Sequence, residues 1–299
     1  MNSPRRLGAD ISAATLLLFV LIPLAALPPF LIYFAWFLPI PLSIFSVHQF
    51  RWTSRLISLI IGICLAYGGL GIAGFVFAYA IYILSQIMAD SIRKGSNPYQ
   101  AIVLGTITFI MLFLVLLARL KWGGIHFYTE LSKHLEQSLT ANPSILKAEK
   151  TSSGQLAALI INQIQLTLPG VLCIIAFLLS SANLLSARIL AKTIGEKPPI
   201  LLSWKLPYGV IFVYIISLTF VLFGSMDSPF WSHVFNSAML FTGFLIGIQG
   251  LAYAWRRLYG HPKAKLWMTL LFIAVLIPIV RSVYILIGLI DSSNRTRKI

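Results

Sequence analysis

A single arginine interrupts the last apolar stretch of the chain, LLFIAVLIPIVRSVYILIGLI, residues 270–290. Arg281 lies three residues after Pro278, close to the middle of this stretch. A charged side chain at the centre of a membrane helix costs about 2.5–3.5 kcal/mol on insertion scales, so it usually has a partner or a purpose. Two explanations stay open. Arg281 either has a structural role, met by carbonyls that Pro278 frees or by a lipid headgroup, or it serves a ligand or an ion pathway.

Other candidate polar groups lie within apolar stretches of the second half of the chain. The stretch LLSSANLLSAR holds Ser180 and Asn183, and Gln249 follows the GxxxG pair Gly243 and Gly247. Small and polar residues let membrane helices approach closely and form hydrogen bonds across the contact. We therefore interpret the two glycines as helix-packing residues. The three polar side chains are candidates either for packing or for lining a solute cavity.

Signatures of catalysis are absent from the sequence, which contains no GxSxG, HExxH, CxxC or phosphate-binding P-loop. The eight acidic residues are scattered without a close pair. His126, Glu130 and His134 do fall on one helical stripe, but eight residues of helix span about 12 Å, too far for all three to hold one tetrahedral ion. The sequence thus predicts no catalytic residue, no metal site and no cofactor.

The composition indicates that lipid surrounds most of the chain. Of the 299 residues, 58% are hydrophobic and 10% are charged, whereas soluble domains carry about 25% charged residues. The net charge of +15 is divided into small basic clusters at the ends of apolar runs. This pattern is typical of orientation signals and headgroup contacts rather than of a nucleic-acid groove. We expect membrane lipids as partners and no nucleic acid.

Apolar runs of about 20 residues, the length needed to cross a bilayer, predict an all-α polytopic membrane bundle of about nine spans. The predicted spans are 12–27, 30–47, 55–68, 71–89, 100–118, 164–187, 207–224, 232–254 and 267–290. We favour a full crossing for the last one because 24 apolar residues is the usual crossing length. If the chain instead turns back near Pro278, this segment is re-entrant and about eight spans remain.

One long polar connection separates the two groups of spans. Within it Phe127, Leu131, Leu135 and Leu139 recur every four residues, which predicts an amphipathic helix at 126–140 on the membrane surface or on the bundle. The predicted organisation is an N-terminal bundle of about five spans (1–120), an extracytoplasmic connection (121–163) and a C-terminal bundle of about four spans (164–299).

The distribution of lysine and arginine favours a cytoplasmic N-terminus in a bacterial inner membrane, because the predicted outer turns near 28, 69 and 225 contain no base. With nine spans, Arg256 lies on the inner side and Asp291 on the outer side. There we expect Asp291 to pair with Arg295, one helical turn further on.

Five stretches of the sequence resemble the YybS-like family of predicted bacterial integral membrane proteins, whose function is largely uncharacterised. They are FLPIPLSIFSVHQFRWTSRLISLIIG (37–62), NLLSARIL (183–190), WKLPYGVIF (204–212), GIQGLAYAWRRLYGHPK (247–263) and GLIDSSNRTRK (288–298). The N-terminal half of that family is distantly similar to the substrate-capturing subunits of energy-coupling-factor vitamin transporters. The resemblance implies binding of a small solute within the bundle, together with a partner transport subunit, and it carries over no catalytic residue.

The sequence therefore predicts a non-catalytic integral membrane protein that binds a small solute or serves as the membrane component of a transporter. Other membrane subunits are its expected partners. The alternative is a membrane scaffold that recruits a partner through the helix at 126–140. A third hypothesis is an enzyme that acts on a lipid-linked substrate.

Overall fold

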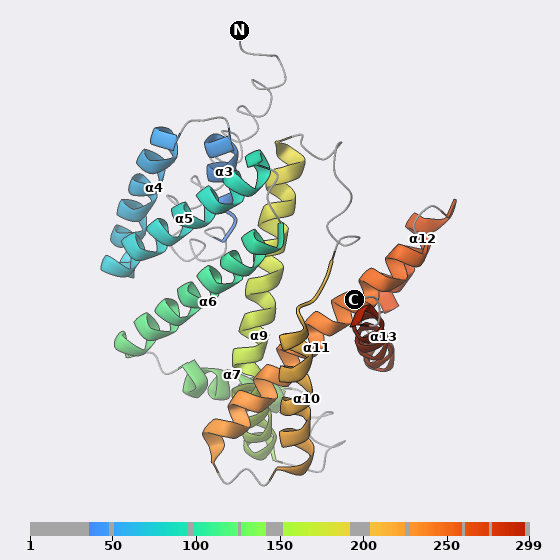
Figure 1. Cartoon of the computed structure of the whole chain (residues 1–299). Helices are drawn as coiled ribbons and strands as arrows, with labels where there is room; N and C mark the ends of the chain where they lie inside the picture. The colour runs from blue at the N-terminus through green and yellow to red at the C-terminus, as the bar shows by residue number, and fades with distance from the viewer. Residues whose placement is uncertain are drawn as a thin grey trace. The chain divides into compact units, whose positions relative to one another are not determined.

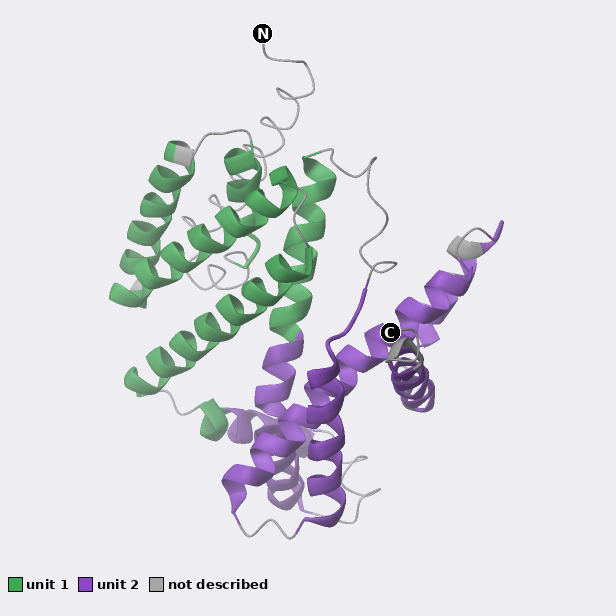
Figure 2. Cartoon of the chain, viewed as in Figure 1, with its two compact units in different colours: residues 1–130, 175–197 green, residues 131–174, 198–299 purple. Residues whose placement is uncertain are grey.

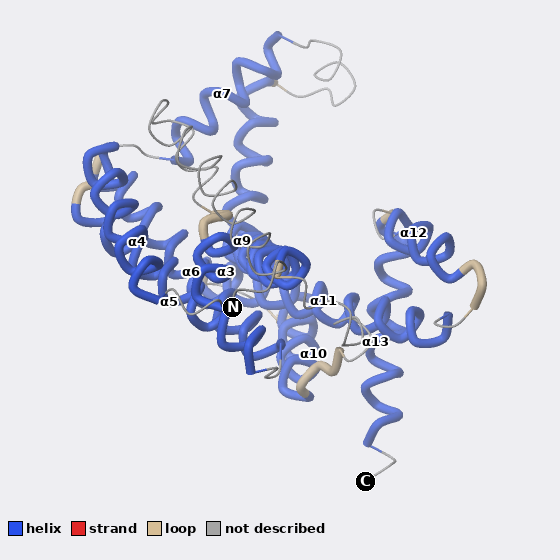
Figure 3. Tube along the Cα trace, turned by 90° about the horizontal axis from the view of Figure 1, so that it is seen from above, coloured by secondary structure: helices blue, strands red, loops and turns tan. Residues whose placement is uncertain are grey.

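The computed structural model of the chain consists of helices joined by short connections wherever it describes the residues (Figure 1). The described residues are 36–47, 51–94, 98–124, 127–141, 152–191, 204–224, 228–258, 261–274 and 277–296. No strand occurs within these ranges (Figure 3). The predicted all-α class is confirmed. The predicted span 12–27 and most of the span 30–47 lie outside the described residues.

Prolines set the start of four helices. These are α3 (Pro39–Val47), α6 (Pro98–Trp122), α11 (Pro229–Leu258) and α13 (Pro278–Thr296). Proline suits the first position of a helix because its fixed φ is helical and its missing N–H would have no partner there. Many of the breaks in the apolar runs therefore mark where the next helix begins.

The chain forms two compact units (Figure 2). Unit 1 comprises residues 1–130 and 175–197. Its described helices are α3, α4 (Arg51–Leu65), the short π-helix η2 (Ala66–Leu70), α5 (Ile72–Lys94), α6 and the last part of α9 (Ser153–Leu190). The chain reverses between α4 and α5 at Gly71, whose positive φ of 56° suits glycine.

Unit 1 buries an aromatic cluster and also exposes many apolar side chains. The Trp36 ring lies 5.4 Å from the ring of Phe77, 5.8 Å from Phe109 and 4.5 Å from Phe113 between centroids. Outside the core, Ile72 is 85% exposed and Met111 is 59% exposed. A helical protein that is apolar both inside and outside matches a lipid environment better than water.

Unit 2 comprises residues 131–174 and 198–299. It contains most of α7 (Phe127–Ala141), the first part of α9, α10 (Tyr208–Phe223), α11, α12 (Ala264–Ala274) and α13. Two glycines bring α11 and α13 together. A Cβ atom at Gly250 would overlap the Tyr284 carbonyl oxygen, and one at Gly288 would overlap the Ile246 carbonyl oxygen. The two backbones are therefore in direct contact.

A side chain of α11 supplies the hydrogen bond that a proline inside α9 removes. Pro169 has no amide proton, so the carbonyl of Gln165 loses its normal helical partner. The His233 ring Nδ1 lies 2.9 Å from this carbonyl oxygen and, because a carbonyl only accepts, Nδ1 is the donor. One turn along α11, the Ser237 hydroxyl donates to the Leu166 carbonyl at 3.2 Å. A freed backbone group in an apolar surrounding is thus satisfied within the protein, as a membrane requires.

Four described helices are long and apolar enough to cross a membrane: Ile72–Lys94, Pro98–Trp122, Ser153–Leu190 and Pro229–Leu258. Two shorter apolar helices, Ser54–Leu65 and Tyr208–Phe223, coincide with further predicted spans. The predicted segment 267–290 is not one helix, because α12 ends at Ala274 and α13 begins at Pro278 (Figure 3). The count of nine spans therefore stays a prediction.

Candidate functional site

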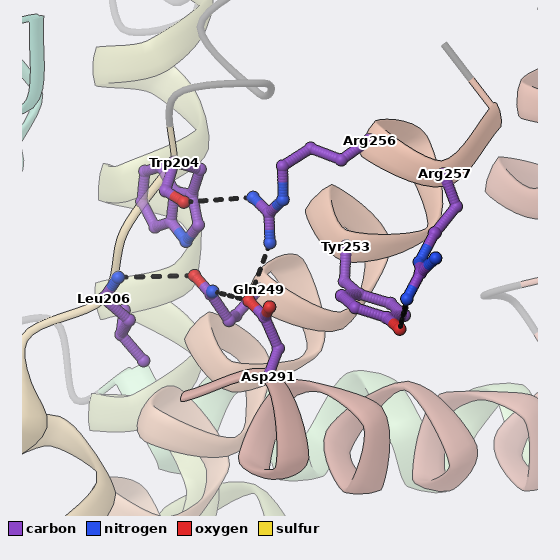
Figure 4. Close-up of polar contacts among 7 residues, drawn as sticks. All are labelled: Trp204, Leu206, Gln249, Tyr253, Arg256, Arg257 and Asp291. Atoms are coloured by element: carbon purple, nitrogen blue, oxygen red, sulfur yellow. Dashed lines mark hydrogen bonds and ion pairs between the residues drawn. The ribbon is translucent and has the colours of Figure 1, made fainter. Parts of the chain in front are cut away.

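Unit 2 contains a charged network centred on Asp291 of α13 (Figure 4). Its carboxylate oxygen Oδ2 accepts a hydrogen bond from Arg256 Nη2 at 2.6 Å and another from the Gln249 side-chain amide, both on α11. The Gln249 side chain is fully buried, and the side chains of Asp291 and Arg256 are 11% and 26% exposed. The two charges are therefore largely removed from solvent and face each other.

The network extends to the segment that precedes α10. The Leu206 amide donates to Gln249 Oε1 at 3.3 Å, and Arg256 Nη1 donates to the Trp204 carbonyl at 3.4 Å (Figure 4). Gln249 and Arg256 each bond both to Asp291 and to this main chain. The network consequently joins three segments that are far apart in the sequence.

The glycine contacts of α11 and α13 position these side chains. Gln249 directly precedes Gly250, and Asp291 lies three residues after Gly288, on the same face of α13. Because the backbones meet at the glycines, the amide at 249 reaches the carboxylate at 291. Arg256 lies about two turns after Gln249 and reaches the same carboxylate with its longer side chain.

The neighbouring Arg257 lies in a different environment from Arg256. Arg257 is exposed and stacks on Tyr253 of its own helix, with 5.4 Å between its guanidinium carbon and the ring centroid. It also donates to the Tyr253 hydroxyl at 3.1 and 3.2 Å (Figure 4). Arg257 is thus a surface arginine, whereas Arg256 connects elements within unit 2.

The network can bind charge in two ways. The guanidinium presents planar donors that fit a carboxylate or a phosphate, and Asp291 now occupies one edge of it. An anionic group on a solute would compete with Asp291 for Arg256, and a cation or a proton would compete with Arg256 for Asp291. A buried ion pair contributes little net stability compared with an apolar contact of the same size. Stability alone therefore does not account for an ion pair in this apolar protein.

Two of the sequence-predicted polar residues lie in unit 1, on α9. The Ser180 hydroxyl donates to the Ile102 carbonyl of α6 at 2.9 Å. The Asn183 amide nitrogen donates to the Trp36 carbonyl at 3.0 Å and to the Leu179 carbonyl at 2.8 Å. Both side chains are fully buried. Asn183 Oδ1 is buried and finds no hydrogen-bond partner among the described residues.

The remaining predicted residues lie in unit 2. Gln249 is part of the charged network. A Cβ atom at Gly243 would lie 3.1 Å from the Tyr214 ring, and one at Gly247 would lie 3.9 Å from Ile285. Arg281 is in the first turn of α13 with a half-buried side chain. Its main-chain amide donates to the Ile277 carbonyl at 3.0 Å.

Comparison with known proteins identifies the family. A family described as predicted membrane proteins, DUF2232, matches residues 13–292. The chain belongs to DUF2232. No curated protein and no solved structure matches it. With its family and its apolar helices, this DUF2232 chain is a multi-pass membrane protein.

Sequence reasoning missed Arg256, Asp291 and the main chain of Trp204 as site groups in this DUF2232 chain. Arg256 reads as an orientation signal, and Asp291 was expected to pair with Arg295, whose side chain lies outside the described residues. Asp291 pairs with Arg256. The sequence did contain one signal of this network. Three of the stretches that carry the family resemblance (204–212, 247–263 and 288–298) supply every residue of the network.

The predicted surface helix is present as α7. Leu139 is buried, Leu131 and Leu135 are half-buried, and Lys133, Glu136 and Gln137 are exposed beside an open hollow of about 600 Å³. Burial raises the pKa of the Tyr128 phenol, which therefore stays neutral at physiological pH. His126 of the predicted polar stripe is outside the described residues. Groups of three potential metal ligands do not occur among those that are described.

Proposed function

We propose that this protein is a non-catalytic membrane component that binds a small solute, by itself or as part of a transporter, and that Arg256, Asp291 and Gln249 form its polar binding site. The observation that carries the proposal is the shielded Arg256–Asp291 ion pair, braced by Gln249 and by the main chain of Trp204 and Leu206. Ionisable groups inside membrane proteins usually mark substrate or ion pathways.

The proposed site favours a solute with a carboxylate or another anionic group. Such a group would take the place of Asp291 on the Arg256 guanidinium, and the amide of Gln249 would remain as a second donor. The resemblance to YybS-like proteins, and through them to the solute-capturing subunits of energy-coupling-factor transporters, supports a solute of vitamin size. Asn183, Ser180 and Arg281 remain candidates for a separate part of the pathway.

The proposed topology has about eight spans, with the segment 267–290 re-entrant. The ion pair supports this arrangement because Arg256 and Asp291 must lie at the same depth to be 2.6 Å apart. A full crossing between them would separate them by about 30 Å of hydrocarbon. The eleven residues of α12 extend about 16 Å, roughly half of that thickness. With a cytoplasmic N-terminus in a bacterial inner membrane, the C-terminus is then cytoplasmic as well.

A tag after Ile299 tests this topology. We expect a cysteine-reactive or enzymatic reporter there to be accessible only from the side that a reporter at the exposed residue Lys263 also faces. Labelling of the two positions from opposite sides of the membrane would show a full crossing and would reject the re-entrant segment.

Thermal unfolding of the purified protein tests the binding site. We expect at least one compound from a panel of vitamins, nucleobases and amino acids to raise the Tm of the wild type. The same compound should leave the Tm of Arg256→Met unchanged, while Arg257→Met should respond like the wild type. Silence across the panel, or an undiminished response in Arg256→Met, would reject the proposed site.

A scaffold function is the second candidate, and the exposed polar face of α7 favours it. Charge reversal at Lys133 and Glu136 should then release a membrane subunit that co-purifies with the protein, without lowering the Tm. Unchanged co-purification would count against recruitment through this helix.

A further inference from the structure

The exposed face of α4, continued by the π-helix η2, forms one apolar stripe with an aromatic residue at each end. Its large members are Trp52, Leu56, Leu59, Ile60, Ile63 and Tyr67, which are 41–91% exposed. Their spacing of three and four residues places them on one side of a helix. In a membrane protein such a face contacts acyl chains. Trp52 and Tyr67 are about 22 Å apart along the helix and suit the two interfaces, where these amphipathic rings are enriched.

Arg55 lies at the Trp52 end of this stripe and is held in place by aromatic groups. Its guanidinium carbon lies 5.2 Å from the centroid of the Trp52 ring. Its Nε donates to the Tyr82 hydroxyl of α5 at 3.0 Å. The Tyr82 ring stacks on Tyr79 with 6.5 Å between centroids, and Tyr79 is 65% exposed. We name Trp52, Arg55 and Tyr82 the Arg55 cluster; all three belong to α4 and α5, the neighbouring helices of unit 1 (Figure 1).

The charge of Arg55 has no carboxylate beside it within the described part of the chain. There, Asp90 pairs with Arg93 and Lys94 at the end of α5, and Asp291 pairs with Arg256 in unit 2. The Arg55 side chain is exposed, so its positive charge is also not neutralised by a group buried inside the protein. An arginine next to acyl chains is stable only where it reaches the headgroup layer.

The Arg55 cluster leaves the phosphate-binding edge of the guanidinium open. Of the five N–H donors, the one on Nε is engaged by Tyr82, and the cation–π contact with the Trp52 ring uses none of them. Within the described part of the chain, the donors on the two Nη atoms make no hydrogen bond. The donors on both Nη atoms lie in the plane and can bind two oxygens of one phosphate. The fixed orientation lowers the entropy that the side chain loses on binding.

We propose that the Arg55 cluster binds the phosphate of an anionic phospholipid, whose acyl chains lie along the α4 stripe. The lipid class follows from charge. The ammonium group of a zwitterionic lipid would need an anion, and the cluster offers none, whereas an anionic headgroup balances Arg55. Exposure of the cluster and of the stripe distinguishes this surface from the shielded network in unit 2.

Native mass spectrometry of the full chain in detergent, titrated with phosphatidylglycerol, tests the site. Removal of one cation next to an anionic lipid is expected to weaken binding of the first lipid about fivefold, so Arg55→Gln should show this loss. Tyr82→Phe, which keeps the ring and removes the hydroxyl that orients Nε, should show a smaller loss. Tyr79→Phe is the matched control, because Arg55 donates to the Tyr82 hydroxyl and not to that of Tyr79, and it should bind like the wild type.

The source of the phosphate and the integrity of the fold are tested in the same experiment. Phosphatidylcholine should bind more weakly than phosphatidylglycerol, and inorganic phosphate should not compete, because it lacks acyl chains. Arg55→Lys keeps the charge and should retain part of the affinity, while its Tm should equal that of Arg55→Gln. Equal lipid binding by wild type and Arg55→Gln, an equal loss in Tyr79→Phe, or full competition by inorganic phosphate would overturn the proposal.

Discussion

The two units of this protein satisfy their buried polar groups in different ways. In the described part of unit 1, buried polar side chains are neutral and donate mainly to main-chain carbonyls, either of their own helix or of a neighbouring one. Ser58 bonds to the Ala78 carbonyl at 2.9 Å, and Ser180 bonds to the Ile102 carbonyl at 2.9 Å. Unit 2 instead holds the Asp291–Arg256 pair with the amide of Gln249.

This difference distinguishes polar groups that support helix packing, as in unit 1, from a site that a charged group can reach, as in unit 2. A hydroxyl that donates to a carbonyl costs little to desolvate and tightens a helix contact, which is its usual role in membrane bundles. A carboxylate and a guanidinium cost far more to bury, and each must keep its partner. Loss of one charge in unit 2 is therefore expected to be more damaging than loss of one hydroxyl in unit 1.

The largest expected effect is that of Arg256→Met, which removes the cation beside the Asp291 carboxylate. We expect a loss of about 2 kcal/mol in the free energy of unfolding, near the low end for a buried pair because Arg256 is 26% exposed. In thermal unfolding this corresponds to a Tm lower by about 4–8 °C. The neighbouring surface residue is the control, and Arg257→Met should lower the Tm by no more than about 1–2 °C.

The double variant Arg256→Met/Asp291→Leu sharpens this comparison. Removal of both charges should recover most of the lost stability, because an apolar pair replaces an ion pair at little cost. If the free energy of unfolding lost in the double variant equals the sum of the losses in the two single variants, the ion pair is not the source of the difference between the units.

The helices could be predicted from sequence because lipid imposes a simple pattern. Long apolar runs predicted the helices at 71–89 and 100–118, and a four-residue apolar spacing predicted α7 within a residue at each end. The separation of α12 from α13 was foreseen only as an alternative, because the run 267–290 is apolar throughout except for Arg281. Its length favours a crossing, while Pro278 favours the start of a new helix.

The charged network could not be predicted, because its members are far apart in sequence. Arg256 and Asp291 are separated by 35 residues, and Arg256 and Trp204 by 52. Local spacing instead paired Asp291 with Arg295, and it emphasised the GxxxG pair rather than Gly250 and Gly288, where the backbones meet. Helical periodicity specifies which face a residue occupies and not which helix lies against that face.

An intermediate effect is expected for His233→Ala, which leaves the Gln165 carbonyl without the donor that replaces the amide of residue 169. An unsatisfied carbonyl costs about 1–3 kcal/mol when fully buried, and this contact is part-buried, so we expect a loss of about 1 kcal/mol, which a lower Tm should report. The second substitution Pro169→Ala supplies an amide proton at that position, so His233→Ala/Pro169→Ala should regain stability. Failure of Pro169→Ala to rescue would show that His233 acts through another contact. His261→Ala, at an exposed position, is the control.

The smallest effect is expected in unit 1, where two adjacent serines of α9 differ in their bonding. Ser180→Ala removes the bond to the Ile102 carbonyl, but that carbonyl still accepts from the Thr106 hydroxyl at 2.7 Å, so the loss should be about 0.5–1 kcal/mol. Ser181 Oγ is buried with no hydrogen-bond partner among the described residues. Ser181→Ala should therefore leave the Tm unchanged or raise it slightly, because no bond is lost and an unsatisfied hydroxyl is removed. Equal losses from the two serines would mean that the neutral bonds of unit 1 do not hold its helices together. The contrast with the charged network would then rest on unit 2 alone.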